Sequence, residues 1–444
     1  MAQRSRSRIL LYGCATAFVL IVTPDLRAED SSETRKELQE LKQENRELRE
    51  LLKKQGGLIE ALNHKVDTLQ EASAERGREL EQLKDGAPAA NAITSTLGKV
   101  NISGEGAVAF FNSGREGAFP NSEFRVDEAK LFLEAPVMSD VYFFTELNLM
   151  TRESYDLTLQ LGEAYLDFEN ISKLWKQERM LNLRVGRIDI PFGEEYIARD
   201  AIDNPLITHS LTDFWGVDEG VELYGSIGNV SYVAAVQNGG ASGVRDFDGD
   251  KAVVGRFSYD AAKWLHLSVS GMRTGNLKYS ADNWSELYFA NGWFMPIDRA
   301  STTRYHANLV EGDIQIRLPH GHVNAFGGYA RYEDNDPTAN NRRDIYFYSV
   351  EGVHDLTRKL YAVVRFSQIF TDKGYMIQGL GDSNEYVFGG VLTKEIWRLS
   401  LGLGYRWSPN LITKVEYAFE RGKETNGNTR NHEDLFALQA AFKF

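Results

Sequence analysis

The sequence predicts an all-β protein, a 16-stranded antiparallel transmembrane β-barrel that follows an N-terminal α-helical coiled coil. Three observations carry this prediction. In segment after segment of residues 98–444, apolar residues alternate with polar or small ones, which is the period of a β-strand. The connections between these segments are alternately short and long, as in transmembrane barrels. Before residue 86 the period is 3.5 residues instead, which indicates a coiled coil.

The composition favours one large β-structure over several ordinary domains. The 444 residues include 39 Gly, 24 Phe and 20 Tyr but only 10 Pro. Aromatic side chains suit a pleated surface and glycine supplies turns. No segment has the 18 uninterrupted apolar residues that indicate a transmembrane helix. We therefore expect strands, and not helices, to cross the membrane.

Residues 1–28 have the layout of a secretory signal peptide. Three arginines precede an apolar run at residues 9–22, and a small residue, Ala28, stands at the expected cleavage site. The run is shorter than the roughly 20 residues that span a bilayer as a helix, although a retained anchor is the alternative. Cys14 lies within this run, so the exported chain has no cysteine and no disulfide. Such a chain is a periplasmic β-protein or an outer-membrane barrel.

Residues 29–85 are expected to form a periplasmic coiled coil. Ten of fourteen successive core positions are apolar, without one slip of phase. These positions are Leu38, Leu41, Asn45, Leu48, Leu52, Gln55, Ile59, Leu62, Val66, Leu69, Ser73, Arg76, Leu80 and Leu83. A rise of ~1.5 Å per residue makes the segment a rod of roughly 75 Å, which implies an oligomer. A single solvated helix is the alternative, but it leaves the leucine seam exposed. Residues 86–97 are interpreted as a linker.

Sixteen strand candidates follow the linker. They lie near residues 99–111, 123–135, 141–150, 157–168, 180–188, 218–227, 229–237, 251–259, 263–274, 303–318, 321–333, 343–353, 358–371, 396–407, 410–421 and 432–444. A seventeenth candidate, residues 385–393, breaks the alternation of short and long connections, so residues 372–394 are assigned to an external loop. Both ends of the barrel then lie on the periplasmic side. The final strand alternates up to Phe444, which resembles the assembly signal of outer-membrane barrels.

Several motifs resemble one family of outer-membrane proteins. They are LRVGRIDIPFGEE at Leu183 to Glu195, the strand return from Gly216 to Gly225, and LGLGYRWSPNLITKVEYAF at Leu401 to Phe419. The chain resembles the phosphate- and polyphosphate-selective porins, in a form with an N-terminal coiled coil. The resemblance implies a homotrimer of 16-stranded barrels and a third external loop, here residues 189–217, that bends inward to narrow the pore. It also implies diffusion of small hydrophilic solutes, including anions such as phosphate.

Charged residues of this loop and of the inward strand faces are the candidate pore residues. The candidates for the constriction are Arg184, Arg187, Glu194, Glu195, Arg199, Asp200 and His209. Alternation places further charges on the lumen wall, namely Arg365, Arg398, Arg406, Lys414, Glu146 and Glu222. Two alternatives remain: these charges pair with strand neighbours and only solvate the wall, or the loop faces outward. Because acids and bases are mixed, the sign of the selectivity stays open.

Other functions are less well supported by the residues. The motifs of serine hydrolases, zinc proteases and P-loop enzymes are absent from the sequence, so no enzyme and no cofactor is expected. Asp246, Asp248 and Asp250 have the spacing of oxygen ligands but lack the downstream Glu of an EF-hand, so an ordinary acidic loop is the alternative to a weak cation site.

The remaining predictions concern partners and location. Without residues 1–28 the chain holds 46 basic and 62 acidic side chains, which argues against a nucleic-acid-binding surface. The expected surroundings are the bacterial outer membrane and its lipid. A second hypothesis is structural: the coiled coil crosses the periplasm and links the barrel to the cell wall.

Overall fold

The computed structural model describes residues 93–94, 100–152, 159–240, 246 and 249–444. The predicted signal peptide (1–28) and coiled coil (29–85) lie outside these described residues. The same holds for the predicted linker (86–97), apart from residues 93 and 94, which form β1 (Ile93–Thr94) and pair with the start of the first long strand.

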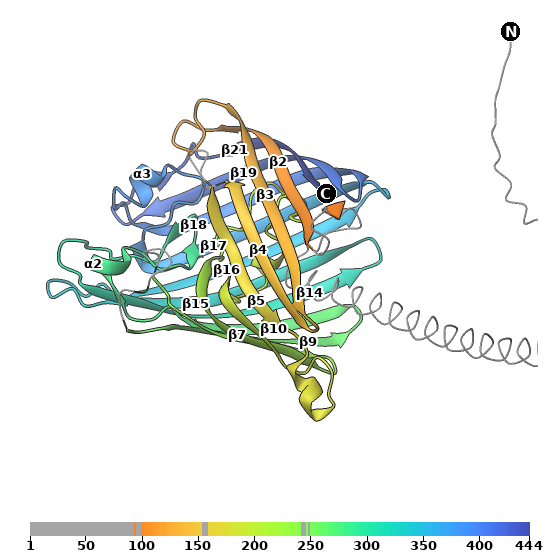
Figure 1. The fold of residues 1–444 in the computed structure, drawn as a ribbon. Helices are drawn as coiled ribbons and strands as arrows, with labels where there is room; N and C mark the ends of the chain where they lie inside the picture. The colour runs from red at the N-terminus through yellow and green to blue at the C-terminus, as the bar shows by residue number, and fades with distance from the viewer. Residues whose placement is uncertain (1–92, 95–99, 153–158, 241–245, 247–248) are drawn as a thin grey trace, which may run out of the picture. The chain divides into compact units, whose positions relative to one another are not determined.

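Within the described residues, sixteen strands of eight or more residues form one antiparallel sheet (Figure 1). They are β2 (Asn101–Ser113), β3 (Glu123–Met138), β4 (Val141–Met150), β5 (Gln160–Phe168), β6 (Asn182–Asp189), β7 (Val217–Ile227), β8 (Val230–Gln237), β9 (Ala252–Ala262), β10 (Leu265–Arg273), β14 (Arg304–Leu318), β15 (Gly321–Asp334), β16 (Arg343–Asp355), β17 (Leu360–Tyr375), β18 (Thr393–Ser408), β19 (Leu411–Glu424) and β21 (Leu435–Lys443). The predicted number of strands is confirmed.

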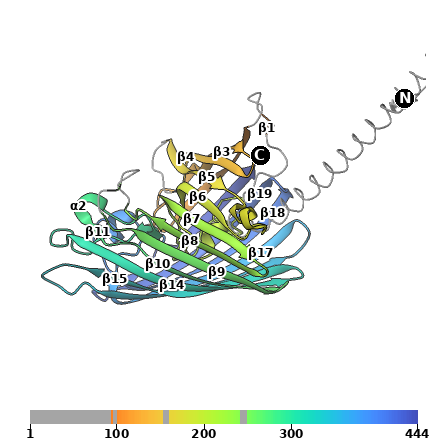
Figure 2. The same cartoon turned by 60° about the horizontal axis from the view of Figure 1, so that its bottom comes forward.

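The sheet closes on itself. Each long strand pairs with the next one along the chain, and the first pairs with the last, with Val108 of β2 opposite Ala440 of β21. Figure 2 shows β9, β10 and β14 side by side in this order. Closure leaves no long strand with an unpaired edge, which removes the tendency of open sheets to aggregate. The structure is therefore the predicted all-β antiparallel barrel.

Short connections and long loops lie at opposite ends of the barrel. The loops at 274–303 and 376–392 carry the short helices α2 (Tyr279–Asp282) and α3 (Ser383–Tyr386), and Figure 1 places both helices at the end opposite the C terminus. Residues 376–392 form a loop, so the seventeenth strand candidate does not add a strand to the barrel. The predicted loop of 372–394 is shorter than expected at both ends, because β17 continues to Tyr375 and β18 begins at Thr393. One connection departs from the pattern: residues 169–181, on the short-turn side, contain the 3₁₀ helix η1 (Ile171–Trp175).

The remaining elements are small. β11 (Leu277–Lys278) adds to β14, β20 (Thr429–Arg430) adds to β19, and β12 (Tyr288–Phe289) pairs with β13 (Gly292–Trp293). The 3₁₀ helix η2 (Glu195–Ala198) lies in the loop after β6. No helix in the described part of the chain is long and apolar enough to cross a membrane.

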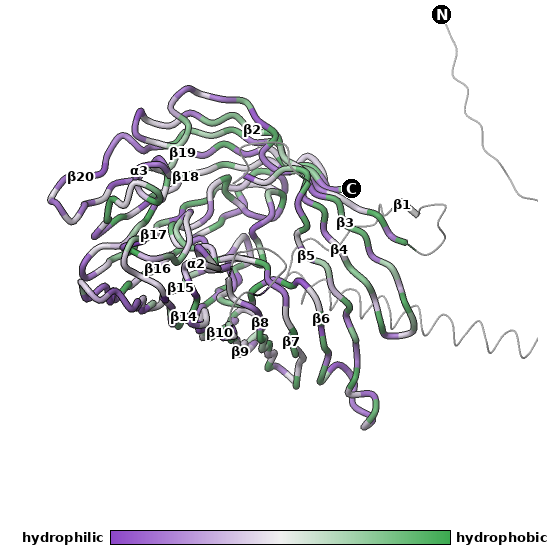
Figure 3. Tube along the Cα trace, turned by 60° about the vertical axis from the view of Figure 1, so that its left-hand side comes forward, coloured by the Kyte–Doolittle hydropathy of each residue, from purple (hydrophilic) through white to green (hydrophobic). Residues whose placement is uncertain are grey.

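The two faces of the barrel wall have opposite character. On β14, Val310 and Ile314 are 46% and 37% exposed, whereas Glu311 and Asp313 on the other face are only 2% and 9% exposed. Figure 3 shows the same alternation of hydrophobic and hydrophilic residues along the strands. Apolar side chains that face outward around buried charges are the reverse of a water-soluble protein and typical of a transmembrane barrel.

An aromatic core occupies part of the barrel near the long loops. Phe214 of the loop after β6 stacks on Phe289 of the 274–303 loop, with ring centroids 5.3 Å apart, and Phe289 stacks on Phe294. Tyr375 at the end of β17 joins this cluster. The buried apolar residues therefore bind the two longest loops to each other and to the wall, and they give the loop after β6 a defined position.

Candidate functional site: a charged cavity beside the inserted loop

The loop at residues 190–216, here called the inserted loop, is bound to the inner face of the barrel from its first turn. Gly193, whose φ of 69° suits glycine, donates its N–H to Ser270 Oγ at 3.1 Å. Its carbonyl oxygen accepts a hydrogen bond from Arg256 of β9. Both partners lie on inward-facing positions of β9 and β10, so the chain turns into the barrel directly after β6.

The middle of the inserted loop is bound to the opposite part of the wall. Glu416 of β19 accepts hydrogen bonds from the backbone N–H groups of Ile207 at 2.6 Å and Thr208 at 2.7 Å. Lys414 of the same strand donates to the carbonyl oxygens of Ala201 at 2.6 Å and Leu206 at 2.8 Å. Backbone groups away from water need such partners, so wall charges replace water for this irregular segment.

Two arginines extend this attachment. Arg365 of β17 binds the Glu351 carboxylate at 2.9 and 2.5 Å and also donates to the Thr208 carbonyl oxygen at 2.7 Å. Arg398 of β18 binds Glu420 at 2.6 Å and donates to the carbonyl oxygen of His209 at 3.2 Å. Arg365, Arg398 and Lys414 point from the wall to the inserted loop, which covers them.

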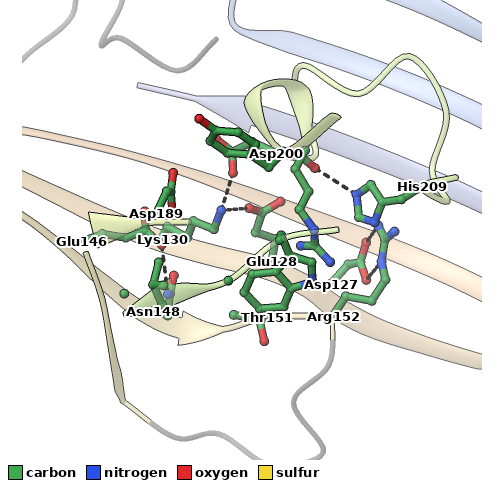
Figure 4. A pocket seen from close by; sticks show the side chains of 16 residues that line it. Asp127, Glu128, Lys130, Glu146, Asn148, Thr151, Arg152, Asp189, Asp200 and His209 are labelled. Atoms are coloured by element: carbon green, nitrogen blue, oxygen red, sulfur yellow. Dashed lines mark hydrogen bonds and ion pairs between the residues drawn. The ribbon is translucent and has the colours of Figure 1, made fainter. Parts of the chain in front are cut away.

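On its other side the inserted loop faces a cavity (Figure 4). Strands β3 to β5 and the ends of β6 and β7 supply the facing wall. The lining residues are Asp127, Glu128, Lys130, Glu146, Asn148, Thr151, Arg152, Gly162, Asp189, Tyr196, Arg199, Asp200, His209, Trp215, Gly216 and Val217. We call this space the loop cavity. It contains acidic and basic groups from both the loop and the wall.

Lys130 connects the wall of the loop cavity with the inserted loop. Its ammonium group lies 2.6 Å from Glu128 and 3.3 Å from Glu105, and it also binds Asp200 of the loop. Among the described residues, Glu105, Glu128 and Asp200 form a group whose carboxylate oxygens lie within 4.8 Å of one another, a spacing that a metal ion can use. The Lys130 ammonium contacts all three carboxylates and supplies positive charge at this position.

The other two basic residues of the cavity are also bound to carboxylates. Arg152 forms a two-point contact with Asp127, at 3.0 and 2.5 Å. Arg199 binds Asp213 in the same way, at 3.1 Å for both bonds, and lies 4.2 Å above the Trp215 ring. Burial alone favours a neutral Asp213, but Arg199 and His209 reverse this effect and hold the pKa of Asp213 well below its usual range.

The structure separates the predicted constriction residues into two groups. Arg199, Asp200 and His209 line the loop cavity, whereas four others lie outside its lining and have their own partners. Arg184 pairs with Asp167 at 3.0 Å and with Glu222 at 3.1 Å, and Arg187 pairs with Glu219 at 3.0 Å. Glu194 accepts a hydrogen bond from Ser258 at 3.1 Å and contacts His266. Glu195 accepts two hydrogen bonds from Ser210. Burial raises the pKa of Glu195.

The predicted lumen-wall residues also have different positions. Arg365, Arg398 and Lys414 lie beneath the inserted loop, and Glu146 lines the loop cavity. Glu222 pairs with Arg184. Arg406 is exposed near the short-turn rim, where it binds Asp355 at 2.8 Å.

The weak cation-site candidates bind basic side chains. Asp246 contacts Lys251, and Asp250 binds Arg273 at 2.8 Å. Asp248 lies outside the described residues. In the described part of this loop the carboxylates are therefore used in ion pairs.

Sequence reasoning did not select Asp127, Glu128, Lys130 or Arg152. Asp127 lies at a β-bulge in β3: Ala107 lies opposite Glu128 and Val108 opposite Val126, so Asp127 is an extra residue. The bulge shifts the phase of the alternation, and both Asp127 and Glu128 reach the cavity. The signal in the sequence that could have revealed this bulge was the pair of adjacent charged residues, Asp127 and Glu128, inside the strand predicted at 123–135.

The fold and this cavity define a closed 16-stranded transmembrane barrel with a charged interior. No family model and no curated protein matches the sequence. Among solved structures, the chain is similar to the outer membrane channel DcaP of Acinetobacter baumannii, with a TM-score of 0.53 and 15% identity over 80% of this chain and 99% of that one. It is also similar to OmpT, an outer membrane protein of Vibrio cholerae, with a TM-score of 0.50 and 10% identity over 80% of this chain and 100% of that one. The chain thus has the barrel fold of bacterial outer-membrane proteins.

Proposed function

We propose that the protein is an outer-membrane channel through which small hydrophilic solutes diffuse, and that the inserted loop narrows its pore. One observation carries the proposal: a closed barrel with an apolar exterior holds a charged cavity between the loop and strands β3 to β5. A wall of this kind suits lipid outside and water inside. The similarity to the DcaP channel supports the same location and activity.

The position of the inserted loop supports a pathway along the loop cavity. Its other flank is bound to β17, β18 and β19 through buried charges, and its aromatic residues pack against the 274–303 loop. Solutes therefore move along the loop cavity, where the loop contributes Arg199, Asp200 and His209. Pore width and the charges at the narrowest point then select the solute.

Three finer predictions stand beside this proposal. The homotrimer and the phosphate preference are implied by the family resemblance. The expectation of diffusion without an enzymatic step rests on the absence from the sequence of serine hydrolase, zinc protease and P-loop motifs. The charges of the loop cavity favour a different preference from phosphate.

Site-directed labelling tests the pathway. Cys14, in the predicted signal peptide, is the only cysteine, so a new cysteine gives a single labelling site in the exported chain. In a Thr151→Cys variant, a water-soluble methanethiosulfonate reagent should reduce the conductance of the channel in a planar bilayer. Asn229→Cys, in the turn between β7 and β8, is the control and should be labelled without a loss of conductance. Equal conductance of the Thr151→Cys channel before and after labelling would contradict this pathway.

A further inference from the structure

The inserted loop is strongly acidic. Residues 190–216 contain five carboxylates and one arginine, a net charge of −4 with histidine neutral. The acidic residues are Glu194, Glu195, Asp200, Asp203 and Asp213. A loop of this charge changes the field of any pore into which it folds, because low-dielectric walls focus the field of nearby charges.

The same loop covers basic residues of the wall. Arg365, Arg398 and Lys414 are 7%, 2% and 4% exposed, and each donates to a backbone carbonyl oxygen of the loop. A solute in the loop cavity therefore does not contact these three cations. These three cations lie on the inner face of the wall, but the loop separates them from the pathway.

The residues that do line the loop cavity are more acidic than basic. Five carboxylates line it, against three permanently charged basic side chains. The carboxylates are Asp127, Glu128, Glu146, Asp189 and Asp200, and the basic residues are Lys130, Arg152 and Arg199. All three basic groups are bound to carboxylates, as described above, so their field is largely cancelled at short range.

We propose that the channel prefers small cations over small anions, and that Glu128 of β3 and Asp200 of the inserted loop set this preference. The inference rests on the proposed function, since it assigns a charge preference to that pathway. Glu128 and Asp200 approach the cavity from opposite sides and meet at Lys130, where the two carboxylates outnumber the one ammonium group. A cation that passes this point is attracted by the excess negative charge, and an anion is repelled.

The test is the reversal potential of the purified full-length protein in a planar bilayer under a potassium chloride gradient. The expected sign is that of a potassium-selective pore. The preference should shrink as the salt concentration rises, because the screening length falls from about 10 Å at 0.1 M to about 3 Å at 1 M. Glu128→Gln together with Asp200→Asn should shift the reversal potential toward zero, and Lys130→Gln should shift it further toward the potassium potential.

The matched control is Glu178→Gln, which removes one carboxylate from the exposed turn between β5 and β6 and should leave the reversal potential unchanged. A chloride-signed potential of the unmodified protein would overturn the cation preference while leaving the channel itself in place. A potassium-signed potential that the Glu128 and Asp200 substitutions do not alter would overturn the assignment to these residues. Absence of conductance would overturn the proposed function as well.

Discussion

Glu416 and Thr208 are joined by two hydrogen bonds, although they are 208 positions apart in the sequence. The Glu416 carboxylate accepts the Thr208 backbone N–H at 2.7 Å and its hydroxyl group at 2.5 Å. The contact joins the middle of the inserted loop to β19 and lies in the buried interior. It is one of the contacts that hold the loop inside the barrel and keep the loop cavity on one side of it.

Weakening this contact should loosen the loop. Glu416→Gln removes the charge that Ile207 and Thr208 share, and hydrogen bonds to a charged group contribute about 1.5–3 kcal/mol. We expect a loss of that size in the free energy of unfolding, measured by urea titration, together with larger current fluctuations in single-channel recordings. Glu395→Gln is the control, because Glu395 lies nearer the surface, where it accepts one hydrogen bond from Gln368 at 3.1 Å and meets Lys423 at 3.8 Å. Quiet, unchanged currents in Glu416→Gln would contradict the role of this contact.

The buried pair of Arg365 and Glu351 predicts a strong dependence on both partners. Arg365→Met leaves the Glu351 carboxylate buried without its arginine and should lower the free energy of unfolding by about 3–5 kcal/mol. Replacing both residues, Arg365→Met with Glu351→Leu, should recover much of that loss. Arg406→Met breaks an exposed pair with Asp355 and should cost less than about 1 kcal/mol. A double variant less stable than Arg365→Met would be the opposite of this expectation.

Gly193 allows the chain to turn into the barrel. A methyl group at this position would come too close to a carboxylate oxygen of Glu311, in addition to the strain of its positive φ. Gly193→Ala should therefore lower the midpoint of thermal unfolding and alter the conductance. Gly228→Ala is the matched control, since Gly228 also has a positive φ, 62°, but has open space around it. Similar effects of the two substitutions would show that strain alone, without the close approach to Glu311, explains the result.

Asp203 predicts a dependence of stability on pH. Burial, which outweighs the nearby Lys443, raises its pKa to about 7, compared with roughly 3.9 in an unfolded chain. Between these values the folded protein binds more protons than the unfolded chain, so stability is greatest at the acidic end and falls as pH rises to about 7. Asp203→Asn should reduce this fall, measured as the unfolding temperature from pH 4 to pH 7.

The control for this prediction is Asp336→Asn in the loop after β15. Hydrogen bonds from Thr338 lower the pKa of Asp336, so its titration lies below this pH window. The variant should keep the pH dependence of the unmodified protein. A slope that is the same with and without Asp203 would show that other groups cause it.

Local patterns were enough for the barrel but not for the cavity. Alternation placed Arg365, Arg398 and Lys414 on the inner face, since the direction of a strand side chain follows from its neighbours. The same reasoning did not select Lys130 and its neighbours on β3, where a bulge at Asp127 interrupts the alternation. It also grouped Arg184 with Arg199, although Arg184 pairs with Asp167 and Glu222 and lies outside the cavity lining.

The sequence by itself determined the class of fold, the number of strands and the connection that is long enough to enter the barrel. These properties depend on period, turn residues and segment length, all of which are local. Only the tertiary structure decided where the inserted loop is attached and which charges face the loop cavity. Those contacts join residues as far apart in the sequence as Ile207 and Glu416. They depend on the position of each side chain along the barrel axis, which the alternation of residues does not determine.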